Sequence, residues 1–173
     1  MKKISTKKLI ILAMLVAFDV IFSRVLAINV LTFKVGIGFA AIAVCAMLYG
    51  PVWAGICAAL SDIIGALLFP TGAYFPGFTV TAALVGVIFG LLLYKKRPDF
   101  KRAFFAALCV GVCVTMLANT AMISFVYGPK FWPLFVTRLA EFGVMLALQT
   151  AVITALGSSD ALYGKIVELR NED

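Results

Sequence analysis

Long apolar runs recur along this chain, separated by short stretches that contain proline, glycine or charged residues. A helix needs about 20 apolar residues to cross ~30 Å of hydrocarbon, and lipid leaves the backbone no other hydrogen-bonding partner. The runs therefore predict membrane-spanning helices. The composition agrees, because 64% of the 173 residues are hydrophobic and 13% are charged, against roughly half and a quarter in soluble proteins. We expect one transmembrane domain over residues 1–173.

The breaks between runs predict six spans, which places both termini on one side of the membrane. Gly50-Pro51 separates the second span from the third, since proline suits a first helical turn. The basic start resembles a signal peptide, but its apolar run has no small-residue cleavage site, so we expect a retained helix. The predicted spans are Lys8–Ile28, Val35–Tyr49, Val52–Leu68, Gly77–Tyr94, Ala103–Tyr127 and Leu134–Leu156, with connectors at 29–34, 69–78, 95–102 and 128–133 and a charged, amphipathic tail from Gly157.

Basic residues are concentrated on the side that carries the termini. Cytoplasmic loops of membrane proteins are enriched in Lys and Arg, so we expect both termini in the cytoplasm of a multi-pass cell-membrane protein. The net charge of +7 then reflects topology and needs no nucleic-acid partner. Eleven of the 15 basic residues lie on this side: Lys2, Lys3, Lys7, Lys8, Lys95, Lys96, Arg97, Lys101, Arg102, Lys165 and Arg170.

Several spans carry ionisable or amide side chains, which are expensive inside a bilayer and mark candidate functional sites. Those of Arg24, Asp62, Asn119, Arg138 and Glu141 are all expected in the outer half of the membrane, and the inner half carries almost none. This asymmetry predicts a cavity that opens outward. The alternative is structural, with Arg138 and Glu141 as an i,i+3 pair and Asn119 joining helices.

Aromatic residues gather at the same outer end, with cations beside them. An interfacial belt would explain some of them, but a belt does not call for acids and amides beneath it. Cations attract a carboxylate and aromatic faces stack on a flat ring, so we predict an anionic aromatic metabolite as ligand. The aromatic residues are Phe33, Phe39, Phe69, Tyr74, Phe75, Tyr127, Phe131 and Trp132, and the cations are Arg24, Lys34, Lys130 and Arg138.

Residues for catalysis or metal binding are poorly represented. The chain has no His and no nucleotide-binding motif, and its cysteines lie inside apolar runs, where cysteine acts as a small hydrophobe. Cys109 and Cys113 are four residues apart, which is not a C-x-x-C spacing. We therefore predict no enzyme, no metal and no cofactor in this chain. Two other classes of protein compete with a binding subunit: a membrane enzyme acting on lipids, and a stand-alone carrier or channel. A carrier or channel would need polar groups along the full membrane depth.

Ala13 and Ala17 are one turn apart near the predicted cytoplasmic end of the first span. Small residues at this spacing allow a second helix to approach closely. That helix could belong to this chain or to a partner, and on spacing alone packing within the chain is the simpler interpretation.

The sequence resembles the substrate-binding S components of energy-coupling-factor (ECF) vitamin transporters, and among them the folate-specific member. The resemblance covers nearly the whole chain. It rests on LYGPVWAG, ALSDIIGALLFPTGAYFPGFT, KVGIGF, Ser23-Arg24, Tyr127-Gly128, Arg138-Leu139 and the Ala13-x-x-x-Ala17 motif. It implies a six-helix bundle with an outward site and no catalytic set.

The resemblance also implies partners and a ligand. The partners would be a transmembrane T component, which docks on Ala13 and Ala17, and two cytoplasmic ATPases that use ATP. The ligand would be folate, with a flat pterin and a dicarboxylate tail, although S components of one fold bind different vitamins. Arg24, Lys34 and Arg138 would hold the carboxylates or cap the pterin. Asp62, Asn119 and Tyr74 would hydrogen-bond the edge of the pterin or stack on its face. Phe75, Tyr127 and Trp132 would lie beside them.

Overall fold

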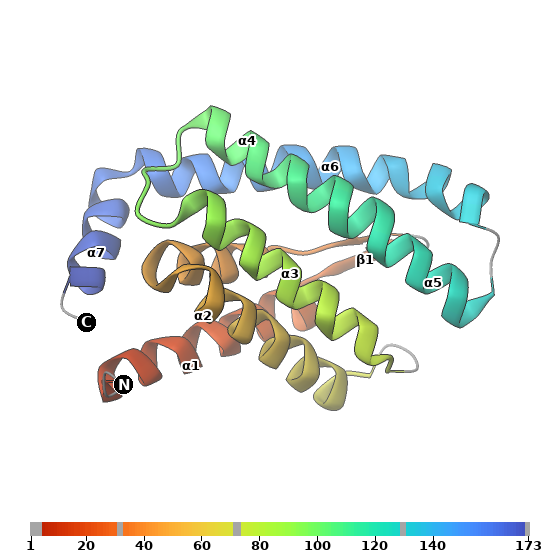
Figure 1. The fold of residues 1–173 in the computed structure, drawn as a ribbon, viewed down its shortest axis with the longest axis horizontal. Helices are drawn as coiled ribbons and strands as arrows, with labels where there is room; N and C mark the ends of the chain where they lie inside the picture. Colours follow the sequence, from red (N-terminus) through yellow and green to blue (C-terminus); the bar gives the residue numbers. More distant parts are fainter. Residues whose placement is uncertain (1–4, 31–32, 71–73, 129–130, 172–173) are drawn as a thin grey trace.

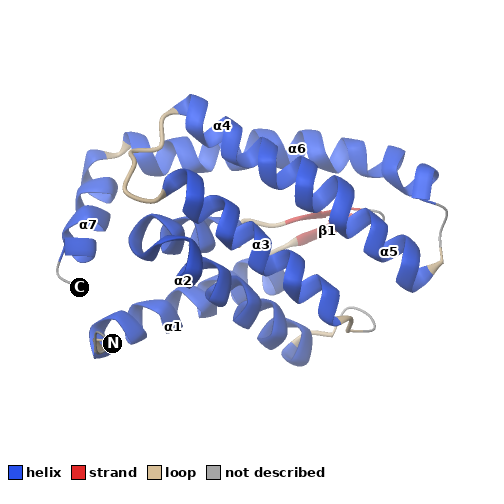
Figure 2. Cartoon of the chain, viewed as in Figure 1, coloured by secondary structure: helices blue, strands red, loops and turns tan. Residues whose placement is uncertain are grey.

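The computed structural model describes residues 5–30, 33–70, 74–128 and 131–171, and within them the chain is helical apart from one short hairpin (Figure 2). This confirms the predicted all-α membrane class. Two segments, labelled η, are π-helical turns continuous with their neighbours. The elements are α1 Thr6–Val20, η1 Ile21–Val25, β1 Ile28–Val30, β2 Phe33–Val35, α2 Phe39–Leu68, α3 Pro76–Leu93, α4 Phe100–Cys109, η2 Val110–Asn119, α5 Thr120–Tyr127, α6 Phe131–Ser158 and α7 Asp160–Asn171.

The six predicted spans correspond to six helical segments: α1–η1, the two halves of α2, α3, α4–η2–α5 and α6. The second and third spans are continuous as α2, with a sharp kink at Gly50, where φ is 82°. Such a φ is strained for any residue with a Cβ, so glycine makes this break possible.

Some predicted boundaries were wrong. Residues expected to form a plain connector pair instead as an antiparallel hairpin, with Asn29 opposite Lys34. The first helix ends at Val25 rather than Ile28, because the chain turns into this hairpin. Helix α3 starts at Pro76 and α6 at Phe131, so Pro76 and Pro133 lie in first turns, where proline is tolerated. The tail from Gly157 forms the helix α7.

The helices form two layers (Figure 1). Helix α6 lies alongside α4, η2 and α5, while α1, α2 and α3 lie together on the other side, and α3 contacts both α4 and η2. Helix α7 turns back across one end and packs against α2. The start of α1 and the end of α7 both lie at this end.

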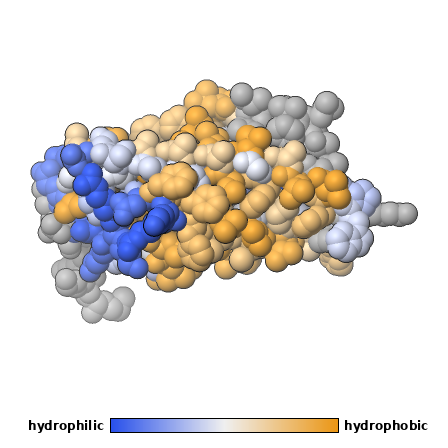
Figure 3. All heavy atoms as spheres, turned by 90° about the horizontal axis from the view of Figure 1, so that it is seen from above, coloured by the Kyte–Doolittle hydropathy of each residue, from blue (hydrophilic) through white to orange (hydrophobic). Residues whose placement is uncertain are grey.

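The face of the molecule shown in Figure 3 is apolar along most of its described length and hydrophilic at one end. Hydrophilic residues gather at the end that carries α7 and the loop before α4, and apolar atoms cover most of the remaining length. Within the described residues, four helical segments are long and apolar enough to cross a membrane: Phe39–Leu68, Pro76–Leu93, Phe100–Val126 and Arg138–Ser158.

Helices α2 and α3 are held together by backbone contact. A Cβ at Gly86 would lie 2.3 Å from the carbonyl oxygen of Ala54, and one at Gly90 would lie 2.2 Å from the Cα of Pro51. Small residues four apart allow this approach in membranes. The second half of α2 and α3 therefore form a rigid pair just beyond the Gly50 kink.

Replacing Gly86 with alanine should destabilise the protein by roughly 1–3 kcal/mol, because the added methyl group meets backbone that cannot rotate away. The measurement is thermal unfolding of purified protein in detergent. Gly143→Ala is the matched control, since nothing lies within 4 Å of a Cβ built there. An unchanged melting temperature for Gly86→Ala would contradict the close packing.

Candidate functional site

A cavity of about 270 Å³ lies between the two helical layers. Its apolar walls come from α2, α3 and η2 and include Ile42, Val85 and Val110. Its polar lining is supplied from four directions by α1–η1, α2, η2 and α6. The polar lining residues are Asp19, Ser23, Arg24, Ser61, Asp62, Thr115 and Gln149.

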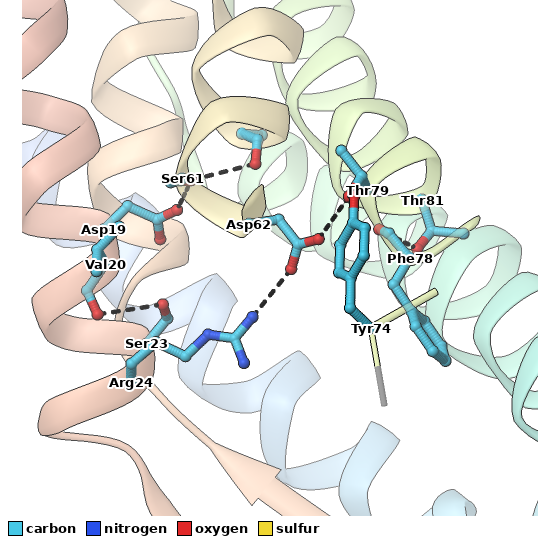
Figure 4. A network of polar contacts seen from close by, with 11 residues as sticks. Asp19, Val20, Ser23, Arg24, Ser61, Asp62, Tyr74, Phe78, Thr79 and Thr81 are labelled. Carbon is cyan, nitrogen blue, oxygen red and sulfur yellow. Dashed lines mark hydrogen bonds and ion pairs between the residues drawn. The ribbon is translucent and has the colours of Figure 1, made fainter. Parts of the chain in front are cut away.

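A chain of polar contacts crosses one side of this cavity (Figure 4). The guanidinium Nη2 of Arg24, on η1, donates to Oδ1 of Asp62 on α2 at 3.0 Å. The hydroxyl of Thr79 donates to Oδ2 of Asp62 at 2.9 Å, and the Tyr74 hydroxyl lies 2.8 Å from that of Thr79. Since Thr79 has one hydroxyl hydrogen and directs it to Asp62, Tyr74 is the donor to Thr79. Three of the predicted site residues, Arg24, Asp62 and Tyr74, therefore belong to one network.

The Arg24–Asp62 ion pair is largely removed from solvent, with side chains 14% and 18% exposed. Its geometry depends on glycine, because a Cβ at Gly65 would lie 2.8 Å from Nε of Arg24. Arg24 itself sits in a π-helical turn, a distortion that is frequent at functional sites. The wide π-helical turn of η1 and the missing side chain at Gly65 together allow α1–η1 to pack close to α2, with the Arg24 side chain between the two helices.

A second carboxylate, that of Asp19, faces the same cavity from α1. Its Oδ2 accepts a hydrogen bond from Ser61, one residue before Asp62. Gly38, at the start of α2, lies so close that a Cβ there would come within 2.4 Å of Oδ1 of Asp19. The cavity therefore carries two carboxylates and one guanidinium, held by neighbouring turns of α1–η1 and α2.

Arg138 and Glu141 form the i,i+3 pair that their spacing predicts, with Nε and Oε2 3.5 Å apart. Glu141 is buried and the Arg138 side chain is 13% exposed, and Nη1 of Arg138 also donates to the carbonyl oxygen of Thr115 at 3.5 Å. That carbonyl oxygen accepts from Thr120 as well. The pair thus ties α6 to η2 and lies outside the described lining of the cavity.

The remaining predicted site residues lie apart from the Arg24 network. Asn119 ends η2, and its Oδ1 is buried without a hydrogen-bond partner in the described part of the chain. Phe75 packs edge-on against Phe78 at the start of α3. Trp132 is 73% exposed at the start of α6 and packs edge-on against Phe135. The side chains of Lys34 and Tyr127 lie outside the described residues.

Six polar residues that line this site or belong to its network were not among the predicted site residues: Asp19, Ser23, Ser61, Thr79, Thr115 and Gln149. The rule that polar groups in spans mark function applies to Asp19 and Gln149 as well as to Asp62. Gln149 is eight residues, ~12 Å, beyond Glu141 along α6, and with Thr150 it is buried. Helix α6 therefore carries buried polar groups further along its length than the residues on which the predicted asymmetry rests.

A separate, apolar groove of about 630 Å³ runs between α1 and the second half of α2. Ala13 and Ala17 line it from α1, and Ile56 and Leu60 line it from α2. Both alanines are exposed. The alternative that they pack inside this chain is therefore wrong, and their small side chains leave space on the surface.

Comparison with known proteins identifies the family to which this fold belongs. A family model for the substrate-specific component of ECF transporters matches residues 7–162. The chain belongs to this family. It is a transport subunit rather than an enzyme, and a multi-pass protein of the cell membrane, as predicted.

Individual relatives of this S component support the same family assignment. The folate transporter FolT of Clostridium novyi (strain NT) is 37% identical over 153 residues, which is 88% of each chain. FolT of Leuconostoc mesenteroides is 29% identical over 156 residues, 87% of this chain and 84% of the relative. A crystal structure of FolT bound with folic acid superposes with a TM-score of 0.83 at 34% identity, covering 88% of this chain and 93% of that one. The predicted resemblance to S components is confirmed.

Arg24→Leu should destabilise the unliganded S component by roughly 1–3 kcal/mol, because the buried carboxylate of Asp62 loses its counter-ion. Replacing both members, Arg24→Leu with Asp62→Leu, should recover most of this loss, since no buried charge is then left unpaired. Thermal unfolding in detergent measures both. A double variant no more stable than Arg24→Leu would show that the two side chains are not coupled.

Proposed function

We propose that this S component binds folate in the cavity between its two layers and delivers it through an ATP-driven ECF complex. The observation that carries the proposal is the cavity between the layers, with an arginine, two carboxylates and an amide, in a chain whose fold matches FolT bound with folic acid. A bundle of apolar helices has no structural need for that many polar groups around one space.

The charge of the cavity favours one orientation of the vitamin. Asp19 and Asp62 carry two negative charges, against the single positive charge of Arg24 in the described lining. A dicarboxylate tail would be repelled there, whereas a pterin offers N–H donors that a carboxylate accepts. We therefore place the pterin ring inside, capped by Arg24, and the tail toward the end that carries Tyr74 and Trp132.

The remaining predicted residues take roles around this placement. The volume of about 270 Å³ is near the lower limit of ligand pockets, so it suits the ring better than the whole vitamin. Asn119, with its buried and unpartnered Oδ1, is a further acceptor for a ligand N–H. Lys34 and Arg138 supply positive charge for the carboxylates, and Phe75, Tyr127 and Trp132 supply aromatic surface.

Delivery requires partners, because this chain has no nucleotide-binding motif. In the proposed complex a transmembrane T component joins the S component to two cytoplasmic ATPases, and the ATPases alone use ATP. The groove beside Ala13 and Ala17 supports this assignment, since an apolar concavity with small residues suits a partner helix. An S component for a different vitamin would share this docking surface but not the polar lining.

Purified wild-type protein should bind folic acid with high affinity in the absence of ATP, because binding precedes any action of the ATPases. Isothermal calorimetry measures the affinity, with riboflavin as a flat vitamin that lacks a dicarboxylate tail. Arg24→Ala and Arg138→Ala should each weaken binding about tenfold or more, as loss of a charge-assisted hydrogen bond is worth roughly 1.5–3 kcal/mol.

Two results would count against the ligand assignment. One is tight binding of another vitamin with none of folic acid. The other is unchanged affinity in both arginine variants while they remain folded, which would make Arg24 and Arg138 structural only.

Ala17→Trp should abolish folate uptake by cells and copurification of the T component, while leaving the affinity for folic acid unchanged. The indole would fill the groove and prevent close helix approach, yet Ala17 is seven residues, ~10 Å, from Arg24 along the helix. Met14→Trp is the matched control, because Met14 is exposed on the same helix but does not line the groove.

Uptake and affinity must be measured on the same variants. Normal uptake by Ala17→Trp would exclude the groove as a docking surface. Equal loss of uptake in Ala17→Trp and Met14→Trp would show that any bulky residue on α1 interferes, and would contradict a specific role for the groove.

A further inference from the structure

The side chain of Gln149 lines the cavity from α6, and the residue is 7% exposed. Within the described residues its amide makes no hydrogen bond. A carboxamide has two N–H donors and one acceptor oxygen. Those of Gln149 are not among the enclosed polar atoms that lack a partner, so the amide faces the space of the cavity. An amide that faces a binding cavity and makes no hydrogen bond within the described protein is available to a group bound there.

The adjacent residue shows what a purely structural polar group looks like in the same turn. Thr150 is equally buried, but its hydroxyl donates to the carbonyl oxygen of Leu146 at 2.7 Å, so it is satisfied within its own helix. Thr150 does not line the cavity. Thr150 is therefore satisfied without a ligand, whereas the hydroxyl of Thr154, one turn further along α6, is buried without a partner in the described residues.

The surroundings of Gln149 restrict what could bind. The cavity walls include Ile42, Val85 and Val110, which offer apolar surface to the faces of a ring. A neutral amide does not compensate the charge of a carboxylate, and the excess of acidic groups in the lining disfavours an anion. The chemistry suits a neutral heteroaromatic ring with a donor and an acceptor side by side on its edge.

We propose that Gln149 is a specificity-determining residue that hydrogen-bonds the heteroaromatic ring of the ligand, an inference that rests on the proposed function. In a pterin, the ring N3–H and the C4 carbonyl form such a donor–acceptor edge, and a carboxamide complements both atoms at once. Gln149 then rejects rings that lack this edge, because its amide would stay buried and unpaired.

The test replaces Gln149 with methionine, which is close in size and has no strong hydrogen-bonding group. The affinity for folic acid should fall about tenfold or more, as expected when a ligand loses hydrogen bonds to a buried edge. The melting temperature without ligand should be unchanged, because the amide makes no hydrogen bond to the described protein that the variant would lose. Thr150→Ser, which keeps the hydroxyl, is the matched control and should leave affinity unchanged.

Two fragments separate the ring from the tail: 6-hydroxymethylpterin has the ring alone, and p-aminobenzoylglutamate has the tail alone. In competition with folic acid, Gln149→Met should weaken the pterin fragment by the same factor as folic acid and leave the tail fragment unchanged. The conservative variant Gln149→Asn, with a shorter amide, should fall between wild type and Gln149→Met.

Several outcomes would overturn the inference. Folic acid affinity of Gln149→Met within twofold of wild type would do so, as would a lower melting temperature without ligand, which indicates a structural role. Weakening confined to the tail fragment, or no competition by the pterin fragment with wild type, would place the ring elsewhere. Absence of folic acid binding to wild type would instead overturn the proposed function, so the two failures are distinguishable.

Discussion

The contact between Arg24 and Asp62 joins η1 to α2, beside the hydrogen bond that Ser61 of α2 donates to Asp19 of α1. Two opposite charges 3.0 Å apart, largely removed from solvent, are tolerated inside a bilayer protein because each neutralises the other. Asp62 also accepts from Thr79 on α3, and Thr79 from Tyr74. The relative placement of η1, α2 and α3 around the cavity therefore depends on one carboxylate.

The packing of the first layer suits this role. Gly65 leaves room for the Arg24 side chain, Gly38 leaves room for Asp19, and Gly86 and Gly90 bring α3 against α2. Because these glycines have no side chain, the helices that form one wall of the cavity can pack in close contact. The second layer, which contains η2 and α6, packs against this wall through longer side chains. Its η2 segment is π-helical, and the Arg138–Glu141 pair joins α6 to η2. Contacts within each layer keep its helices together, so a cavity can remain between the two layers.

Much of this architecture could be predicted from local sequence. Apolar run length predicts the spans, Gly50-Pro51 predicts the kink, and i,i+3 spacing predicts the Arg138–Glu141 pair. The β1–β2 hairpin and the π-helical turns could not be predicted, because they depend on hydrogen bonding that residue type does not specify. The pairing of Arg24 with Asp62 spans 38 residues, so only the folded chain brings them together. Gln149 was not predicted as a site residue, although the rule that polar groups in spans mark function applies to it as well.

The central claim is that the cavity lined by Arg24, Asp62 and Gln149 holds folate. Native mass spectrometry of protein purified gently from its own membranes tests this most directly, because it identifies the ligand without assuming one. The account predicts a bound species with the mass of folate or a reduced folate in wild type, strongly depleted in a folded Arg24→Ala variant. A different vitamin in the wild type, or equal folate occupancy in the variant, would contradict it.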